Sequence, residues 1–449
     1  MSPRLSIFKT AARERLAHDL GVLKDPIARS VFRAARLAHS AGSASRRATA
    51  FAWLMRLHSG AFSPAVDARI AREIHDATAL ERRGTATGLS ALYDRVIQAA
   101  VQTFYAAPGP DPHRLIGSRI LVVKGYRPGE RGVLVVDYSY VFPLLAGLFD
   151  LSAIAARYSL VLEPSWAGSC TPDILLYSRL ADRVLVETIE PRDREFLAML
   201  DTNLETVPVA ANWWVDHRAA PALGAPRDFD VIMVAAWAGI KRHWRFFRTL
   251  ADLRRRGHRL KVALVGYRYD LTRADVEALA RHYGVHDQIE TFERISQAEV
   301  SALLARSKVH VLWSRRECAN RAIIEAMLAD VPVIVRDGLT FGYKYPYINE
   351  HTGRFVPEHE LGDAILEMIA ERSRYAPREW ILQNMTCEKA TATLEARLRD
   401  LAVASGAPWT EGLVVKTSTL DTQRYWHAED AARFAPDYQF LASVLRPRP

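Results

Sequence analysis

Residues 309–335 read VHVLWSRRECANRAIIEAMLADVPVIV, and this stretch decides the fold. Its first five residues form a run typical of a strand. A helical pattern follows and ends at Asp330 and Pro332, because proline cannot continue a helix. A second strand-like run, Val331–Val335, closes the stretch. Strand, turn, helix and strand in this order predict a parallel α/β sheet with helices packed on it.

Two glutamates occupy distinct places in this unit. Glu317 lies in the turn after the first strand, at the mouth of the helix, and Glu325 lies further along the helix. At a rise of ~1.5 Å per residue the two carboxylates stand roughly 12 Å apart. That separation is close to the reach from the sugar hydroxyls to the ribose hydroxyls of a nucleotide sugar, and the N–H groups of the helix start would face the diphosphate. The alternative is a solvated helix face, which fits Glu317 less well because ligands of α/β sheets bind in turns after strands.

The segment resembles the Glu–seven residues–Glu motif of family 4 retaining glycosyltransferases, which have the GT-B fold. The likeness extends to the small residues Ala326 and Ala329 and to the P-V-I-V strand that follows them. Residues 352–357, T-G-R-F-V-P, are similar to the turn before the family's last acidic helix. The resemblance implies an enzyme that moves a hexosyl-type sugar from a nucleotide-sugar donor to a glycan, a lipid-linked glycan or a small molecule, with retention of the anomeric configuration.

The expected fold class is α/β, with two Rossmann-like, doubly wound domains that face each other across a cleft, as the resemblance implies. A chain of 449 residues exceeds the usual span of one core. A Pro- and Gly-rich break at 106–112 separates helical spacing from alternating strand-like and helical runs. The predicted parts are a basic helical region at 1–107, an N-terminal acceptor domain at 115–225, a C-terminal donor domain at 227–400, and a tail at 401–449 that packs back on the N-terminal domain.

Composition excludes several classes of protein. Apolar residues make up 49% of the chain and charged residues 25%, as in globular proteins. No stretch is apolar for the ~18 to 20 residues that cross a bilayer, and the start lacks the features of a secretory signal. The three cysteines, Cys170, Cys318 and Cys387, are too few and too far apart for a disulfide framework or a zinc site. We expect a cytoplasmic protein.

The net charge of +9 is concentrated in the first 60 residues, which hold eleven Lys and Arg against three acidic residues. A basic helical arm can lie on an anionic membrane through its charges and a shallow apolar stripe. The residues that could form this stripe are Ile7, Phe8, Leu16, Leu20, Val31, Phe32 and Leu37. The other interpretations are a helical face packed on the rest of the protein and an organelle transit peptide. Nucleic acid is not an expected partner, because aromatic residues do not alternate with the basic ones.

Two cations follow a predicted strand of the second half. Lys241 and Arg242 come after the run V-I-M-V-A, where fixed cations can stabilise a departing diphosphate. Family 4 enzymes usually have an arginine four or five residues ahead of this lysine, whereas this sequence has Ala236 or Trp237 there. Either Arg242 or Arg321 replaces it, or phosphate binding is weaker. The alternative for Lys241 is that it only begins a helix.

The resemblance gives the donor-site residues their roles. Glu317 would accept hydrogen bonds from the sugar hydroxyls and stabilise the positive anomeric centre, and Glu325 would bind the ribose diol. The other residues expected around the donor are Ser314, Cys318, Ala319, Asn320, Arg321 and Gly266, with Phe292 and Arg294 at the base. For Phe292 and Arg294, a plain strand-to-helix loop is an equal alternative.

The acceptor side offers weaker candidates. Gly129 and Gly132 belong to a loop that lies where GT-B enzymes have a glycine-rich loop over the donor phosphates. A hairpin-like turn explains these glycines almost as well. Glu163 and Trp166 follow another predicted strand, and they are the best candidates for contact with the acceptor.

Neither a metal ion nor a cofactor is expected, since the nucleotide sugar is a substrate. The sequence Asp228-Phe-Asp230 imitates a metal-binding motif of another glycosyltransferase fold, but it precedes a strand instead of following one. The expected partners are the donor, a glycan or lipid-linked acceptor, and the inner face of a membrane through residues 1–60. Two other classes remain open: a GT-B-fold sugar-nucleotide epimerase or phosphorylase, and a non-catalytic scaffold at a membrane.

Overall fold

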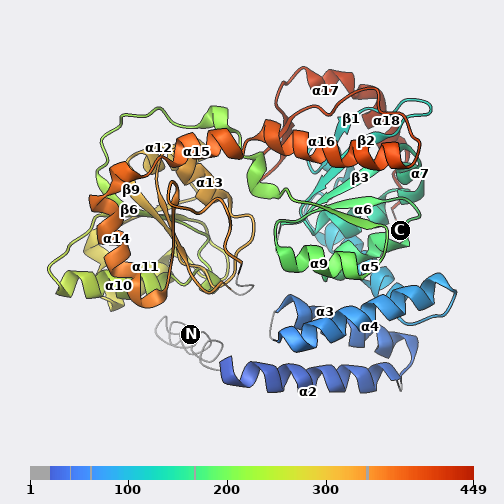
Figure 1. Cartoon of the computed structure of the whole chain (residues 1–449), viewed down its shortest axis with the longest axis horizontal. Coiled ribbons are helices and arrows are strands. Elements are labelled where there is room, and N and C mark those ends of the chain that lie inside the picture. The colour runs from blue at the N-terminus through green and yellow to red at the C-terminus, as the bar shows by residue number, and fades with distance from the viewer. Residues whose placement is uncertain (1–20, 41, 61–62, 166–167, 340–342, 449) are drawn as a thin grey trace. The chain divides into compact units, whose positions relative to one another are not determined.

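The computed structural model describes residues 21–40, 42–60, 63–165, 168–339 and 343–448 (Figure 1). The chain forms two compact units. The first unit comprises Leu23–Val215 and Cys387–Pro449, and the second is built from Asp216–Thr386. Most of the predicted apolar stripe of the N-terminal arm, from Ile7 to Leu20, lies outside the described residues.

The first unit begins with a helical layer and continues as an α/β domain. Its elements up to the end of the sheet are α2 (Gly21–Ser40), α3 (Ala44–Ser59), α4 (Pro64–Arg82), α5 (Leu89–Ala106), η1 (Pro112–Leu115), β1 (Ile120–Lys124), β2 (Gly132–Asp137), α6 (Val141–Leu148), α7 (Leu151–Arg157), β3 (Tyr158–Glu163), α8 (Pro172–Leu175), η2 (Leu176–Arg179), β4 (Val184–Glu187), α9 (Pro191–Met199), β5 (Leu204–Val207) and η3 (Ala211–Trp214). The predicted helical spacing before the linker is realised in α5, whose residues Leu89, Leu92 and Val101 are buried.

The first sheet has the strand order β1-β2-β3-β4-β5. Strands β2 to β5 are parallel, and every residue of β2 is buried. Strand β1 pairs with β2 in the antiparallel direction, which differs from the all-parallel sheet expected from the sequence. The reason is the length of the connection, since the loop between them is too short for the crossover that parallel neighbours need.

The end of the chain returns to the first unit. Its elements are α16 (Cys387–Ala404), β12 (Lys416–Ser418), β13 (Gln423–Tyr425), α17 (Asp430–Arg433) and α18 (Ala435–Ser443). The backbone N–H of Val414 donates to the Val123 carbonyl at 2.9 Å, and the Tyr158 hydroxyl donates to Asp437 at 2.6 Å. The division between the units at residue 386 therefore falls ahead of the predicted boundary at 400, because α16 already packs with the first unit.

The second unit is an alternating α/β domain. Its elements are η4 (His217–Ala219), β6 (Phe229–Val234), η5 (Gly239–Lys241), α10 (His243–Arg255), β7 (Val262–Gly266), α11 (Arg273–His282), η6 (His286–Gln288), β8 (Ile289–Glu293), α12 (Gln297–Ala305), β9 (Ser307–Leu312), α13 (Arg321–Leu328), β10 (Val333–Arg336), β11 (Gly353–Val356), η7 (Glu358–Glu360), α14 (Leu361–Ala370), η8 (Arg372–Arg374) and α15 (Pro377–Asn384). Strand β10 begins one residue after Pro332, which lacks the N–H that a ladder position requires.

The second sheet is parallel throughout, in the order β11-β10-β9-β6-β7-β8. The chain thus runs outward from β6 to β8, returns to the other side of β6, and continues from β9 to β11. Helices cover both faces, because α10 packs with α11 and α14, and α12 packs with α13 (Figure 1). This is the doubly wound arrangement of a Rossmann-like domain.

The predicted fold class is confirmed at this level: two α/β units with largely parallel sheets and a helical N-terminal region. No helix among the described residues has the length and apolar character required to span a membrane.

Candidate functional site

Several of the residues predicted to bind the donor lie where the strand order of the second sheet reverses, between β6 and β9. Strands β6 and β9 are neighbours, and the chain leaves them toward opposite edges of the sheet. Ligands of open α/β sheets bind outside the carboxyl ends of the strands at such a switch point. The two loops that follow these strands are joined directly, since the N–H of Arg315 donates to the Ile240 carbonyl at 2.9 Å.

Glu317 is the centre of this site. Its carboxylate forms an ion pair with the Lys241 ammonium and accepts hydrogen bonds from Ser314 Oγ at 2.5 Å and Asn320 Nδ2 at 3.1 Å. Only 5% of the Glu317 side chain is exposed. Three of the predicted residues therefore converge on the predicted catalytic glutamate, from a loop after β6 and a loop after β9.

Asn320 links the carboxylate to the start of α13. As the N-cap residue, it accepts from the N–H of Ile323 at 3.2 Å through Oδ1, while its Nδ2 donates to Glu317. Asparagine is a favoured N-cap because it satisfies one of the N–H groups that the first turn leaves open. Cys318 and Ala319, both half-buried, complete the turn, and the Cys318 carbonyl accepts from the Asn320 N–H at 3.0 Å.

Glu325 lies in the second turn of α13, as the spacing predicts. Its carboxylate oxygen Oε1 is 3.8 Å from Nε of Arg321 on the preceding turn, and both side chains are mostly buried. Arg321 is the first residue of α13 and therefore stands beside the helix start. A role for Arg321 as a second cation at the phosphate end stays a prediction.

Lys241 does not begin a helix. It ends the short turn η5, and α10 starts after Arg242, whose backbone is left-handed with φ of 55°. The Arg242 side chain is 1% exposed, and its Nη2 donates to Glu358 Oε2 at 2.6 Å. The structure thus connects Arg242 to Glu358 and connects Lys241 to Glu317.

Trp237 is one of the two residues, with Ala236, at the place where the resemblance leads us to expect an arginine. Its ring is fully buried, and its Nε1 donates to Glu293 at 3.2 Å. A Cβ added to Gly266 would lie 2.3 Å from the Ala235 carbonyl oxygen and 2.7 Å from the Trp237 ring. The absence of a side chain at Gly266 is therefore required by packing at the end of β7. Its predicted contact with the donor stays a prediction.

Phe292 and Arg294 flank the end of β8. The Phe292 ring meets Phe229 edge to face, with centroids 6.4 Å apart. Arg294 is exposed, has a left-handed backbone with φ of 52°, and donates its N–H to the Gly266 carbonyl at 3.0 Å. Arg294 directly follows β8 and therefore lies at the carboxyl edge of the sheet, as Glu317 does after β9, with β6 and β7 between these two strands. Phe292 packs against the first residue of β6.

Two residues of the donor edge were missed from the sequence. Arg336 ends β10, and its Nη1 donates to the Gly338 carbonyl at 2.7 Å and lies 3.5 Å from the Ser314 carbonyl oxygen. Glu358 follows β11 and binds Arg242 and Arg245, each at 2.6 Å. Arg336 is the last residue of a parallel strand and Glu358 follows another two residues later, so the rule that identified Glu317 could have identified them.

The glycine loop of the first unit is a hairpin turn. The N–H groups of Arg127 and Glu130 donate to each other's carbonyl groups, at 3.0 and 2.9 Å, between antiparallel β1 and β2. Gly129 has a positive φ of 85°, and a Cβ on Gly132 would lie 2.6 Å from the Lys124 carbonyl oxygen. The turn explains both glycines, so the hairpin-like alternative is the one that the structure shows, and a contact of this loop with donor phosphates stays a prediction.

Glu163 belongs to a buried group of acids at the carboxyl edge of the first sheet. Asp137, Glu163 and Glu187 are the last residues of β2, β3 and β4, and Asp137 is the cross-strand partner of Glu163. Lys416 from β12 donates to Glu163 at 2.5 Å. The sequence analysis identified only Glu163, and Trp166 lies outside the described residues.

Burial changes the protonation of two of these acids. Desolvation, reinforced by the charge of Glu163, raises the pKa of Asp137 to about 7 although Arg119 donates to it at 3.0 Å. Burial likewise raises the pKa of Glu187 well above its ordinary value. Both carboxyl groups therefore hold a proton more tightly than exposed carboxyl groups do.

Among the described residues, no group of three or more His, Cys, Asp and Glu side chains could hold a metal ion. The Asp228-Phe-Asp230 sequence is used for ion pairs instead. Asp228 binds Arg306, whose hydrogen bonds lower the pKa of that carboxyl to about 2, and Asp230 binds Lys308 at 2.7 Å.

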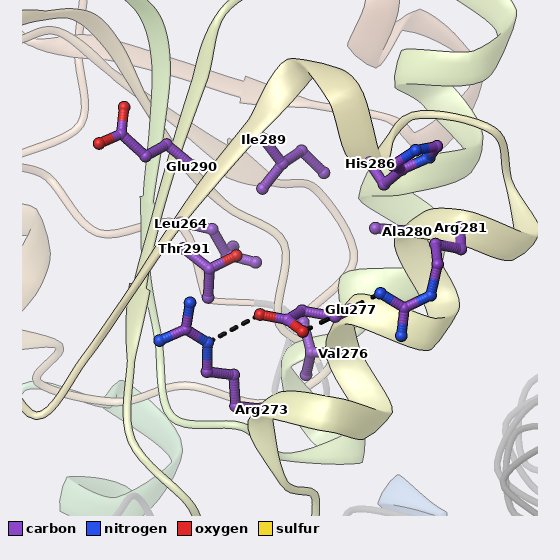
Figure 2. A pocket seen from close by; sticks show the side chains of 10 residues that line it. All are labelled: Leu264, Arg273, Val276, Glu277, Ala280, Arg281, His286, Ile289, Glu290 and Thr291. Carbon is purple, nitrogen blue, oxygen red and sulfur yellow. Dashed lines mark hydrogen bonds and ion pairs between the residues drawn. The ribbon is translucent and has the colours of Figure 1, made fainter.

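A groove of about 320 Å³ lies between α11 and the edge strand β8 (Figure 2). Arg273 and Arg281 both point toward Glu277 there, at 2.7 and 4.0 Å. None of the predicted site residues lines this groove.

Comparison with known proteins agrees with the assignment of the second unit. Residues 220–381, which lie wholly within this unit, match the family model described as glycosyl transferases group 1. No curated protein matches the chain. The match supports a glycosyltransferase domain that contains Lys241, Glu317 and Glu325.

Solved structures with a related arrangement are distant in sequence. A variant of S. aureus TarM in complex with Fondaparinux, alpha-GlcNAc-glycerol and UDP is 14% identical over 59% of this chain and 54% of that chain, with a TM-score of 0.46. Sucrose-phosphate synthase from Thermosynechococcus elongatus is 16% identical over 60% and 73%, with a TM-score of 0.46. Anabaena HepE in complex with UDP and glucose is 15% identical over 59% and 78%, with a TM-score of 0.45. This chain spans about half the length of the TarM chains.

Proposed function

We propose that this protein is a GT-B-type glycosyltransferase of the family 4 kind, which moves a hexosyl sugar from a nucleotide sugar to a glycan, a lipid-linked glycan or a small molecule. The single observation that carries the proposal is the Lys241–Glu317 pair at the switch point of the second sheet. At this edge a largely buried cation suits the leaving diphosphate, and a buried carboxylate suits the sugar on the other side of the bond that breaks. The family match over residues 220–381 supports it.

The pair suggests how the donor is bound. Without donor, Lys241 and Glu317 neutralise each other. A bound diphosphate would compete for the Lys241 ammonium and leave Glu317 free to accept hydrogen bonds from the sugar hydroxyls. Lys241 would then stabilise the negative charge that develops on the leaving diphosphate, where preorganised cations have their largest effect.

Retention and metal independence are part of the proposal. In this site Glu317 already has three protein donors, so it is suited to bind hydroxyls and not to attack the anomeric carbon. The donor phosphate itself would help to deprotonate the acceptor. Product NMR should then show an α-linkage from an α-linked donor, and turnover should survive a chelator; a β-linked product would contradict retention.

The catalytic test compares two buried ion pairs. With UDP-, GDP- and ADP-sugars as donors, Glu317→Gln should lower kcat by about 10²- to 10³-fold, and Lys241→Met should weaken donor binding by about ten- to a hundredfold. The control is Glu130→Gln, which breaks the similarly buried Lys124–Glu130 pair of the first unit, 2.5 Å long. It should lower stability and leave donor affinity unchanged. Full activity in both site variants would refute the proposal and favour the non-catalytic scaffold.

We also propose peripheral membrane contact through the helical layer. On α3, Arg46, Trp53 and Arg56 are exposed, and the Trp53 side chain stands between the two cations along the helix. An aromatic side chain flanked by arginines is suited to the headgroup region of an anionic bilayer. Wild-type protein should sediment with phosphatidylglycerol vesicles and Trp53→Ala should do so less, while vesicles of phosphatidylcholine should recover neither. Equal recovery of both proteins would refute this contact.

A further inference from the structure

The backbone around Lys241 is fixed on both sides. Ahead of it, the Ile240 carbonyl accepts from Arg315 at 2.9 Å, which joins the turn to the loop that carries Glu317. Behind it, the N–H of Arg242 donates to the Gly239 carbonyl at 3.0 Å and closes the turn η5. The position of the Lys241 ammonium therefore depends on how firmly residue 242 is held.

Arg242 is an unusual residue to find at this point. Its φ of 55° is left-handed, a conformation that is costly for a residue with a long side chain and persists only where the surroundings impose it. The side chain is also buried, with 1% exposed. A buried guanidinium requires a partner that neutralises it.

Glu358 supplies that partner and binds two arginines at once. Its Oε2 accepts from Arg242 and its Oε1 pairs with Arg245, both at 2.6 Å. Arg245 lies in the first turn of α10, and its guanidinium also stacks over the Trp244 ring at 4.1 Å. The positive charges of Arg242 and its neighbours keep the pKa of Glu358 below its ordinary value despite burial, so the carboxylate is ionised at neutral pH. The Glu358 carboxylate thus connects Arg242 to α10 through Arg245.

We infer that Glu358 is a positioning residue for Lys241: it holds the turn 239–242 through Arg242 and Arg245 and so places the Lys241 ammonium at Glu317. This inference rests on the proposed function, because the ammonium so placed would meet the donor diphosphate. It also removes Arg242 from the candidates to replace the missing family arginine, since Arg242 is a buried anchor of the turn and not a phosphate ligand; Arg321 or weaker phosphate binding remains.

The inference predicts a defect confined to the phosphate end of the donor. Calorimetry first identifies which of UDP, GDP and ADP the wild-type protein binds most tightly. The affinity for this diphosphate is then compared with the affinity for the corresponding nucleoside. Glu358→Gln should weaken binding of the nucleoside diphosphate by about tenfold and leave binding of the nucleoside unchanged. The matched control is Glu360→Gln in the same turn η7, whose side chain is 52% exposed and pairs with the adjacent His359; it should change neither affinity.

A double-mutant cycle separates positioning from a general loss of structure. If Glu358 acts through Lys241, Glu358→Gln should have no further effect on diphosphate binding in a Lys241→Met background. Arg245→Met, which leaves the Arg242–Glu358 pair in place, should have a smaller effect than Glu358→Gln. Additive losses in the cycle, or an equal loss of nucleoside binding, would overturn the inference. If wild type binds none of the three diphosphates, the proposed function fails as well; if wild type binds one and Glu358→Gln binds it equally, only the inference fails.

Discussion

Asp137, at the end of β2, shows how burial sets the chemistry of one residue. Its pKa is about 7 in the fold, above the value of 3.8 for an unperturbed aspartate. Between these two values the folded state binds more protons than the unfolded state, so this residue's contribution to stability is present at low pH and is lost as the pH rises toward 7. Asparagine in its place has no such dependence.

We therefore predict that Asp137→Asn flattens the pH dependence of folding. Relative to the variant, wild type should lose on the order of 1 to 3 kcal/mol of unfolding free energy between about pH 4 and about pH 7. Urea unfolding of both proteins across this range measures the difference. Parallel curves for the two proteins would show that Asp137 titrates in the fold as it does in the unfolded chain.

The residue scale is also where sequence reasoning worked best and where it failed. Glu317, Ser314 and Asn320 were predicted together because they share one short loop after a strand, and the structure brings them together. Lys416 was missed because it lies 253 residues from Glu163. No local pattern contains a pairing of that range.

At the scale of the element, α13 depends on its N-cap residue. The helix has only eight residues, too few to be stable by propensity alone. Its N-cap, Asn320, also donates to Glu317, so one side chain serves both the helix and the site.

We predict that two substitutions of Asn320 separate these roles. Asn320→Ala removes the cap and the donor, and should cost about 1 kcal/mol of stability and lower kcat. Asn320→Ser keeps a favoured cap but loses the amide, so it should restore stability and leave kcat low. Urea unfolding and turnover measured on the same preparations provide the check. Recovery of kcat in the serine variant would mean that the amide contact with Glu317 is dispensable.

Strands were easier to predict than their directions. The runs at 120–123 and 133–136 are the cores of β1 and β2. Their antiparallel pairing departs from the expected parallel sheet, although it agrees with the hairpin-like turn that the sequence left open. The connection of seven residues already excluded a crossover, which takes a dozen or more. By contrast, the parallel arrangement of β6 to β10 was predicted, because a helix-length segment separates each of these strands from the next. The residues of β11 were expected to form a turn.

At the scale of the whole molecule, the two units differ in which segments of the chain complete them. From residue 23 onward, the second unit is a single segment from residue 216 to 386, whereas the first is completed by the last 63 residues. The tail brings Lys416 into the acidic edge, where it is 1% exposed, pairs with Glu163 and lies 4.2 Å from the centre of the Trp214 ring. The sequence resemblance implied that a tail packs back, but it did not identify the residue that holds it.

Lys416→Met should therefore destabilise the first unit and spare the second. Removing one partner of a buried pair costs about 3 to 5 kcal/mol, because the other charge stays buried and unpaired. Here the loss would be aggravated by Asp137 and Glu187 beside Glu163, so the double variant Lys416→Met with Glu163→Gln should recover much of it.

Thermal unfolding followed with and without the nucleoside diphosphate resolves the units, since a ligand raises the transition only of the part that binds it. The variant should show an early transition that ligand does not move and a later one that ligand raises as in wild type. A single transition that ligand shifts as a whole would mean that the two units unfold together, and that the tail lysine stabilises the entire enzyme.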